Sequence, residues 1–478
     1  MRLTEPLVRR RLALIDRLSA DGRYPRWVLV TALMGIFSVT FPVTVLSVAI
    51  GDMAREFGVR ETTMALVVSV PFLLSGLALP ITGKLGDLYG HRVVFIYGFA
   101  LATVGAALTV FAPNALAVIA CRTFSQVVGS ATIPASSALV LGVHAPDERT
   151  KAMGWWSFVA AAAPAIGLVV GGLVIDSIGW RLLFGIQAVL SAIAVVAAWI
   201  VLSETTERKR VRFDIAGAAL LVLGAGGLMG ALDRGEAWGW THWSVYAGLV
   251  ACVVGLVGFT RVERRTASPL IDLDLLSNTA FRAPLVSMAF FGAAYMSGFV
   301  LAPLMFQEVL GYSAAATSLF MGLRPVSVST GSAAVGRLSD AVGPRTTTII
   351  GTGLLSGSLL LLAFGSSREA VWLMCIAIAL QGIANGTTQP ALQAAVSNAV
   401  DDEDLGIAMA SLRMAMQVGA SLGISALSSI YGGVNEAGRF GATFAAGAGF
   451  AVIAVIAARG VDARTEARAE AARARTAA

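Results

Sequence analysis

Residues 83–92 read GKLGDLYGHR and residues 336–345 read GRLSDAVGPR, and this repeated decapeptide decides the fold. Each copy combines glycines, one aspartate and basic residues in a chain that is otherwise strongly apolar. Each copy also follows the second of six consecutive apolar segments in its half of the chain. An internal duplication of this kind predicts two similar helical bundles, with a binding site near their common midplane.

The sequence around the decapeptides is too apolar for a water-soluble domain. Hydrophobic residues make up 56% of the chain and charged residues only 13%, whereas a soluble domain carries about 25% charged residues. The apolar runs are about twenty residues long, the length that crosses a bilayer as a helix. A helix satisfies its own backbone hydrogen bonds, which lipid cannot do. We therefore predict an all-α polytopic membrane protein.

Fourteen membrane-spanning helices are expected, arranged as two six-helix bundles plus a two-helix insert. The N-terminal tail lacks the pattern of a signal peptide; it is expected to form either a helix on the membrane surface or a solvated tail. The predicted parts are the tail 1–26, the first bundle 27–202, the linker and inserted hairpin 203–282, the second bundle 283–459 and the tail 460–478. The predicted spans are 27–50, 62–82, 93–112, 115–142, 153–175, 181–202, 215–233, 243–260, 283–306, 313–335, 346–365, 370–397, 406–431 and 440–458.

The basic residues predict the orientation of the chain. With the N-terminus inside, 26 of the 35 Lys and Arg residues fall in tails and inner loops, and six fall in outer loops. This bias follows the positive-inside rule and places both termini in the cytoplasm. The net charge of +6 is therefore attributed to topology and not to nucleic-acid binding. The three cysteines show no metal-ligand spacing, so no metal site is expected.

The decapeptides are expected to act as a conformational latch on the cytoplasmic side. Their glycines allow helix ends to approach closely, and their aspartates accept hydrogen bonds from neighbouring helix starts. The alternative is an ordinary inner turn rich in glycine and charge, which the second copy in register makes less attractive. The residues assigned to the latch are Gly83, Gly86, Asp87, Gly90, Arg92, Gly336, Arg337, Asp340, Gly343 and Arg345.

These residues also carry a family resemblance. The pattern Gly83-x-Leu85-x-Asp87-x-x-Gly90-x-Arg92 resembles the signature loop of the major facilitator superfamily, and fourteen spans are typical of its drug:proton antiporter branch. The resemblance implies alternating access, with small amphipathic molecules exported in exchange for protons. It also implies that glycines and a proline in the fifth span pack helices together: Pro164, Gly167, Gly171 and Gly172.

The chain departs from the family pattern in ways that affect proton coupling. Pro42 stands where the family's first span has an acidic residue, and Gln126 lies one place later than the family's glutamine. Proton exchange needs a carboxylate whose protonation alternates with substrate binding. Glu308 or Asp52, near span ends, would have to supply it.

Three arginines inside spans are candidates for a substrate or coupling site. A charge at the bilayer centre costs about 2.5–3.5 kcal/mol on insertion scales, so it faces a cavity or a partner. Arg122 and Arg324 fit this description, whereas Arg413 lies near a span end, where it could also extend to the interface or pair with an inner carboxylate.

Polar side chains at helical spacing extend the candidate site. One face of the twelfth span carries amides at every fourth position, and the first span has a hydroxyl face. Amides of this kind either line a pathway or join helices. In the ninth span, an apolar set offers adaptable contact or faces the membrane. These residues are Gln381, Asn385, Gln389 and Gln393, then Thr40 and Thr44, then Met288, Phe291, Tyr295 and Phe299.

We therefore interpret the sequence as a monomeric exporter in the inner membrane of a bacterium, in contact with lipid and small amphipathic substrates. It needs no cofactor and uses the proton gradient as its energy source. The alternative is a lipid or metabolite carrier without obligatory proton antiport. A membrane-embedded enzyme is a remote alternative, suggested only by the acidic run 401–404, which otherwise favours the start of the next helix.

Overall fold

The computed structural model is helical throughout the part of the chain that it describes, which is residues 5–144, 146–203, 214–266, 273–400, 405–434 and 436–461. The acidic run 401–404 and the C-terminal tail beyond 461 lie outside these residues. Twelve of the described helical segments are long and apolar enough to cross a membrane. Helix α16 and the first part of α14 cover two further predicted spans but are not among the twelve. The count of fourteen spans therefore stays a prediction.

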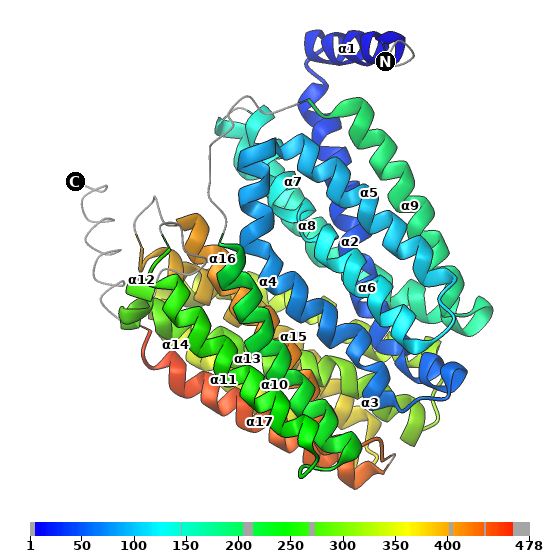
Figure 1. Ribbon diagram of the computed structural model, residues 1–478, viewed down its shortest axis with the longest axis vertical. Coiled ribbons are helices and arrows are strands. Elements are labelled where there is room, and N and C mark those ends of the chain that lie inside the picture. The colour runs from blue at the N-terminus through cyan, green and yellow to red at the C-terminus, as the bar shows by residue number, and fades with distance from the viewer. Residues whose placement is uncertain are drawn as a thin grey trace. The chain divides into compact units, whose positions relative to one another are not determined.

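The chain forms two compact units, and the division falls inside two helices. Unit 1 comprises Met1–Val45 and Ile81–Arg212, and unit 2 comprises Leu46–Pro80 and Phe213–Ala478. Helices α2 and α4 therefore contribute to both units. The N-terminal helices (Figure 1) are α1 (Glu5–Ala20), α2 (Tyr24–Phe57), α3 (Glu61–Met64), α4 (Leu66–Tyr89), α5 (His91–Val110), α6 (Ala115–Gly129), α7 (Thr132–Val143), α8 (Pro146–Ile178) and α9 (Trp180–Val201).

Unit 1 has an apolar core to which α2, α5, α7 and α9 contribute. Phe95 and Phe99 of α5 are almost fully buried there, next to small residues of α9 such as Ala194 and Ala198. The predicted fourth span consists of α6 and α7, and the residues that join them, Ser130 and Ala131, keep helical φ and ψ values, so the two form one continuous segment. The N-terminal tail forms the helix α1, and Arg11 on it donates to the Leu202 carbonyl at the end of α9.

Unit 2 is built around α13, of which most residues are buried. Helix α13 packs against α16 so closely that a Cβ on Gly292 would lie 2.5 Å from the Met416 carbonyl oxygen. Small residues allow this approach, as is common between membrane helices. Helices α10 and α11 pack against each other, and α10 also packs against α16. The helices are α10 (Ile215–Trp238), α11 (Trp243–Glu263), α12 (Leu273–Ser277), α13 (Thr279–Leu304), the π-helix η1 (Met305–Val309), α14 (Ala314–Ser367), α15 (Val371–Ser397), α16 (Leu405–Tyr431) and α17 (Ala437–Ala458).

Both decapeptides form the same kind of junction. Gly90 (φ 98°, ψ 138°) separates α4 from α5, and Gly343 (φ 79°, ψ 163°) separates two helical segments within α14. This backbone conformation is essentially reserved for glycine. The repeat in sequence is therefore also a repeat in backbone geometry.

Candidate functional site

Unit 1 holds Arg122 of α6 in a buried position. Its side chain is 2% exposed, and no carboxylate among the described residues forms an ion pair with it. Its Nη1 donates to Gln187 Oε1 at 3.4 Å, and its guanidinium carbon lies 4.9 Å from the centre of the Phe184 ring. Its Nε is buried without a hydrogen-bond partner. A cation placed over an aromatic face is stabilised, but its unpaired N–H group remains available to a ligand.

A small cavity of about 10 Å³ adjoins this arginine, with room for one water molecule. Gln126, which the sequence predicts as a site residue, lines the same cavity. Gln187 Nε2 donates to the Ser38 carbonyl at 3.2 Å, which fixes the amide that faces Arg122. The lining residues are Ser38, Val39, Phe99, Ala102, Arg122, Ser125, Gln126, Gln187 and Ser191.

Unit 2 holds Arg324 of α14 in a similar environment. It is 1% exposed, and its guanidinium carbon lies 4.8 Å from the Phe299 ring centre and 5.4 Å from the Tyr295 ring centre. Its Nη2 donates to Gln381 Oε1, and to the Gly298 carbonyl at 3.5 Å. Its Nε and Nη1 have no described partner. The aromatic residues of the ninth span are thus buried in unit 2, and of the two interpretations of this set, the one in which they face the membrane is wrong.

The amide face of α15 lies beside this arginine and forms two separate hydrogen-bonded groups. Gln381 Oε1 accepts from Arg324, and Gln381 Nε2 is buried without a partner among the described residues. Asn385 is hydrogen-bonded to the side chain of Tyr295, and Gln389 Nε2 donates to Asn385 Oδ1 at 2.8 Å. The structure therefore brings Arg324, Gln381, Asn385 and Gln389 together, as well as Tyr295, which the sequence did not single out as polar.

A third polar group joins α2 to η1 within unit 2. Arg55 Nη1 lies 2.6 Å from Glu308 Oε1, and Arg55 Nη2 lies 2.5 Å from Asp52 Oδ1. Partial burial alone would lower the pKa of Arg55, but its hydrogen bond to Asp52 and the charge of Glu308 raise it. Gln307 Nε2 also donates to the Val48 carbonyl at 3.0 Å. Both acidic candidates for proton coupling thus bind one arginine.

Other predicted residues lie apart from these three groups. Thr40 is half-buried and donates to the Ile36 carbonyl of its own helix at 2.8 Å. Gln393 is half-buried and Arg413 is exposed. A Cβ on Gly171 would meet Val45 of α2 at 2.6 Å, and one on Gly167 would overlap the Phe41 carbonyl, so α8 lies directly against α2 there. Gly172 is buried and Pro164 is half-buried.

The decapeptides are described only in part. Arg92 Nε donates to the Leu202 carbonyl at 2.6 Å, so the first copy caps the end of α9. A Cβ on Gly86 would overlap the His91 ring, and Arg345 is half-buried. The side chains of the remaining latch residues, and that of Thr44, lie outside the described part: Gly83, Asp87, Gly336, Arg337 and Asp340.

Apolar helices of membrane-spanning length, with buried arginines and amides inside the units, are the features of a polytopic membrane protein. The chain belongs to the Major Facilitator Superfamily, whose family model matches residues 32–328 and 285–478. Its family and the names of its curated relatives point to a transporter and not to an enzyme.

Several curated relatives are named as bacterial drug-resistance proteins. The chain is 26% identical to the multidrug resistance protein Stp of Mycobacterium tuberculosis, over 84% of this chain and 75% of the relative. It is 27% identical to the tetracenomycin C resistance and export protein of Streptomyces glaucescens, over 87% and 77% of the two chains. It is also 27% identical to the methylenomycin A resistance protein of Bacillus subtilis, over 89% and 90%.

Solved structures agree on the fold. The peptide transporter POT in complex with sulfate matches with a TM-score of 0.67 at 17% identity, over 90% of this chain and 94% of the other. The human organic anion transporter MFSD10 (TETRAN) matches with a TM-score of 0.61 at 17% identity, over 92% and 99%. At this identity the likeness shows the fold alone.

Proposed function

We propose that the chain is a secondary active exporter of small amphipathic molecules, drug-like compounds or lipophilic metabolites, that works by alternating access and proton antiport. The observation that carries the proposal is the pair of buried arginines, Arg122 and Arg324, each with an amide, an aromatic face and unpaired N–H groups. A buried cation without a counter-ion is costly unless it serves a ligand. The drug-resistance names of the relatives support the substrate class.

The proposed topology has fourteen spans, a two-helix insert formed by α10 and α11, and both termini in the cytoplasm of a bacterial cell. The positive-inside bias of the sequence supports this orientation. The proposed substrates are neutral, zwitterionic or anionic amphiphiles, because two uncompensated guanidinium groups repel a lipophilic cation. The proposed transporter acts as a monomer.

Glu308 is the proposed proton-coupling carboxylate. It accepts a charge-assisted hydrogen bond from Arg55, and its side chain is only 15% exposed. Protonation would remove its charge and weaken the tie between α2 and η1, which also includes the bond from Gln307 to Val48. Proton binding would thus change a contact that fixes the position of α2 in unit 2.

The test is transport of a fluorescent amphiphile by the purified protein in sealed vesicles with an imposed pH gradient. Collapse of the gradient with a proton ionophore is expected to stop transport by the wild type, and Glu308→Gln is expected to remove the dependence on the gradient. Glu436→Gln, at an exposed position where the side chain does not cap α17, is the matched control. If transport does not depend on the pH gradient in either the wild type or Glu308→Gln, the antiport proposal is wrong.

That result would favour the second candidate, a lipid or metabolite carrier without obligatory proton antiport. One observation supports this candidate: Pro42, which cannot titrate, occupies the place of the family's first-span acid. The same vesicles distinguish the two candidates, because the carrier moves its substrate down a concentration gradient at any transmembrane pH difference.

A further inference from the structure

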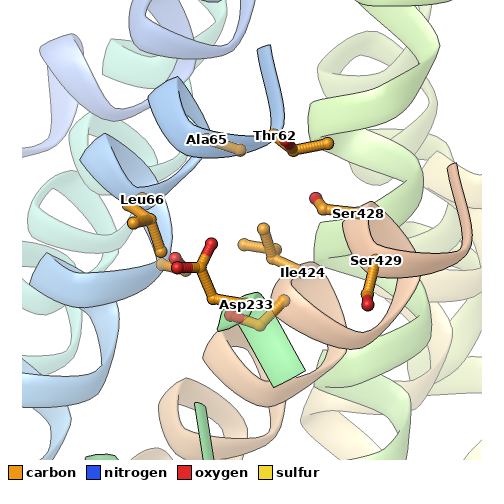
Figure 2. Close-up of a pocket in the computed structure, with 9 residues that line it drawn as sticks. Thr62, Ala65, Leu66, Asp233, Ile424, Ser428 and Ser429 are labelled. Atoms are coloured by element: carbon orange, nitrogen blue, oxygen red, sulfur yellow. The ribbon is translucent and has the colours of Figure 1, made fainter. Parts of the chain in front are cut away.

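A cavity within unit 2, separate from the buried arginines, is lined by six oxygen-bearing side chains and three aliphatic ones. It has about 10 Å³ of space, enough for one water-sized particle. Helix α10 contributes Asp233, α3 and α4 contribute Thr62 and Ser69, and α16 contributes serines, as Figure 2 shows for most of these residues. The lining residues are Thr62, Ala65, Leu66, Ser69, Asp233, Ile424, Ser425, Ser428 and Ser429.

Four of the hydroxyl groups in this cavity are buried without a described hydrogen-bond partner. They belong to Thr62, Ser69, Ser425 and Ser428, each at most 6% exposed. Serine and threonine in membrane helices commonly donate to a carbonyl one turn earlier, as Thr40 and Thr387 do here. A buried hydroxyl without a partner costs free energy, and four around one cavity are best explained by a ligand that all of them contact.

The chemistry of the lining fits a cation. Asp233 is the acidic member of the lining, and the other polar members are neutral hydroxyls. A carboxylate and neutral hydroxyls are hard oxygen ligands, which suit alkali and alkaline-earth ions. A divalent ion would bring more charge than the single carboxylate of the lining neutralises, so a monovalent ion fits better.

We propose that this cavity is a binding site for one dehydrated sodium ion, held by the Asp233 carboxylate and by the hydroxyls of Thr62, Ser69, Ser425 and Ser428. The ion would join α10 to α3, α4 and α16. Two contacts between α10 and α16 support a fixed position for α10. Ser429 Oγ donates to the Leu232 carbonyl at 3.1 Å, and Ser421 Oγ lies 3.3 Å from Met229 Sδ. The site would thus lock the proposed inserted hairpin to the rest of unit 2.

The test measures sodium binding to the purified full-length protein in detergent and does not depend on transport. Radioactive ²²Na⁺ binding and the thermal unfolding midpoint are followed while NaCl replaces choline chloride at constant ionic strength. We expect saturable binding of one ion per chain and a midpoint that rises with NaCl. Asp233→Asn and the double variant Ser425→Ala/Ser428→Ala are expected to weaken binding at least tenfold.

Ser429→Ala is the matched control, because Ser429 lines the cavity but already donates a hydrogen bond to the Leu232 carbonyl. This variant is expected to keep sodium binding. Removing unpaired hydroxyls does not destabilise the sodium-free protein, so the double Ser variant is expected to remain folded. Absence of saturable sodium binding by the wild type would overturn the proposal and leave one water molecule as the occupant. Binding that survives both Asp233→Asn and the double variant would overturn it as well.

Discussion

The two buried arginines occupy similar environments that differ in one respect, namely what surrounds the unpaired part of the guanidinium. Arg122 faces a water-sized cavity lined by serines, and its single described bond to Gln187 is long at 3.4 Å. Arg324 is packed between two aromatic rings, and its amide partner Gln381 lies on the amide face of α15. The difference suggests that Arg324 contacts the substrate directly, whereas Arg122 acts through a bound water.

The largest effect is expected from Arg324→Met. A hydrogen bond to a charged group contributes about 1.5–3 kcal/mol, so its loss should lower export between about tenfold and about a hundredfold. Stability should stay equal or rise, because an uncompensated buried charge is replaced by an apolar side chain of similar length. The measurements are initial rates in sealed vesicles and the thermal midpoint in detergent.

Arg324→Lys separates charge from geometry in this experiment. Lysine keeps the charge but cannot present two parallel N–H groups, so partial recovery would indicate a fork-shaped contact with the substrate. An Arg324→Met protein that unfolds at a lower temperature and exports normally would show that Arg324 only supports the packing of α14 against α13.

A smaller effect, about tenfold at most, is expected from Arg122→Met. Water-mediated contacts are nearly as favourable as direct ones, but a water can rearrange when its donor is lost. The ratio of the two export rates, measured in the same vesicles, tests the comparison directly. An Arg122→Met defect larger than that of Arg324→Met would reverse the proposed roles. The isosteric variant Gln187→Glu, which supplies a counter-ion to Arg122, should lower export to a similar degree.

The sequence predicted the arginines but not which side chains surround each of them. Because a charge in lipid is costly, an arginine inside an apolar segment is a candidate site residue, and Arg122 and Arg324 can each be recognised without knowing their neighbours. Gln187, Phe184 and Tyr295 lie on other helices, and the period of one helix does not reveal what another helix brings to it. The amide face of α15 was predictable because its members repeat on a single helix.

The lengths of the membrane-spanning helices were also predictable from the sequence. The bilayer fixes the length of an apolar helix, so α5 and α9 begin and end within about three residues of the predicted spans. Helix α2 extends well past the predicted 27–50 because its polar last turns, which carry Asp52 and Arg55, are held by contacts to η1 and not by apolarity. The hydroxyl-lined cavity could not be predicted from the sequence, since serine and threonine side chains normally form hydrogen bonds within their own helix.

The smallest effects are expected at the two glycine junctions of the decapeptides, Gly90→Ala and Gly343→Ala. Both glycines have φ and ψ values that cost any other residue about 1–3 kcal/mol, so both variants should lower the thermal midpoint. The junction at Gly90 also positions Arg92, which caps α9 at Leu202 and Trp199. The junction at Gly343 is followed by local bonds within α14, such as that from Thr347 Oγ1 to the Gly343 carbonyl at 2.7 Å.

Gly90→Ala should therefore destabilise more than Gly343→Ala, because it also disturbs a contact between helices. Arg92→Met isolates this contribution: if the cap explains the difference, Gly90→Ala combined with Arg92→Met should be no less stable than Gly90→Ala alone. Full additivity of the two changes would mean that the junction and the cap act independently. In that case the two copies of the decapeptide share a backbone conformation but not a mechanical role.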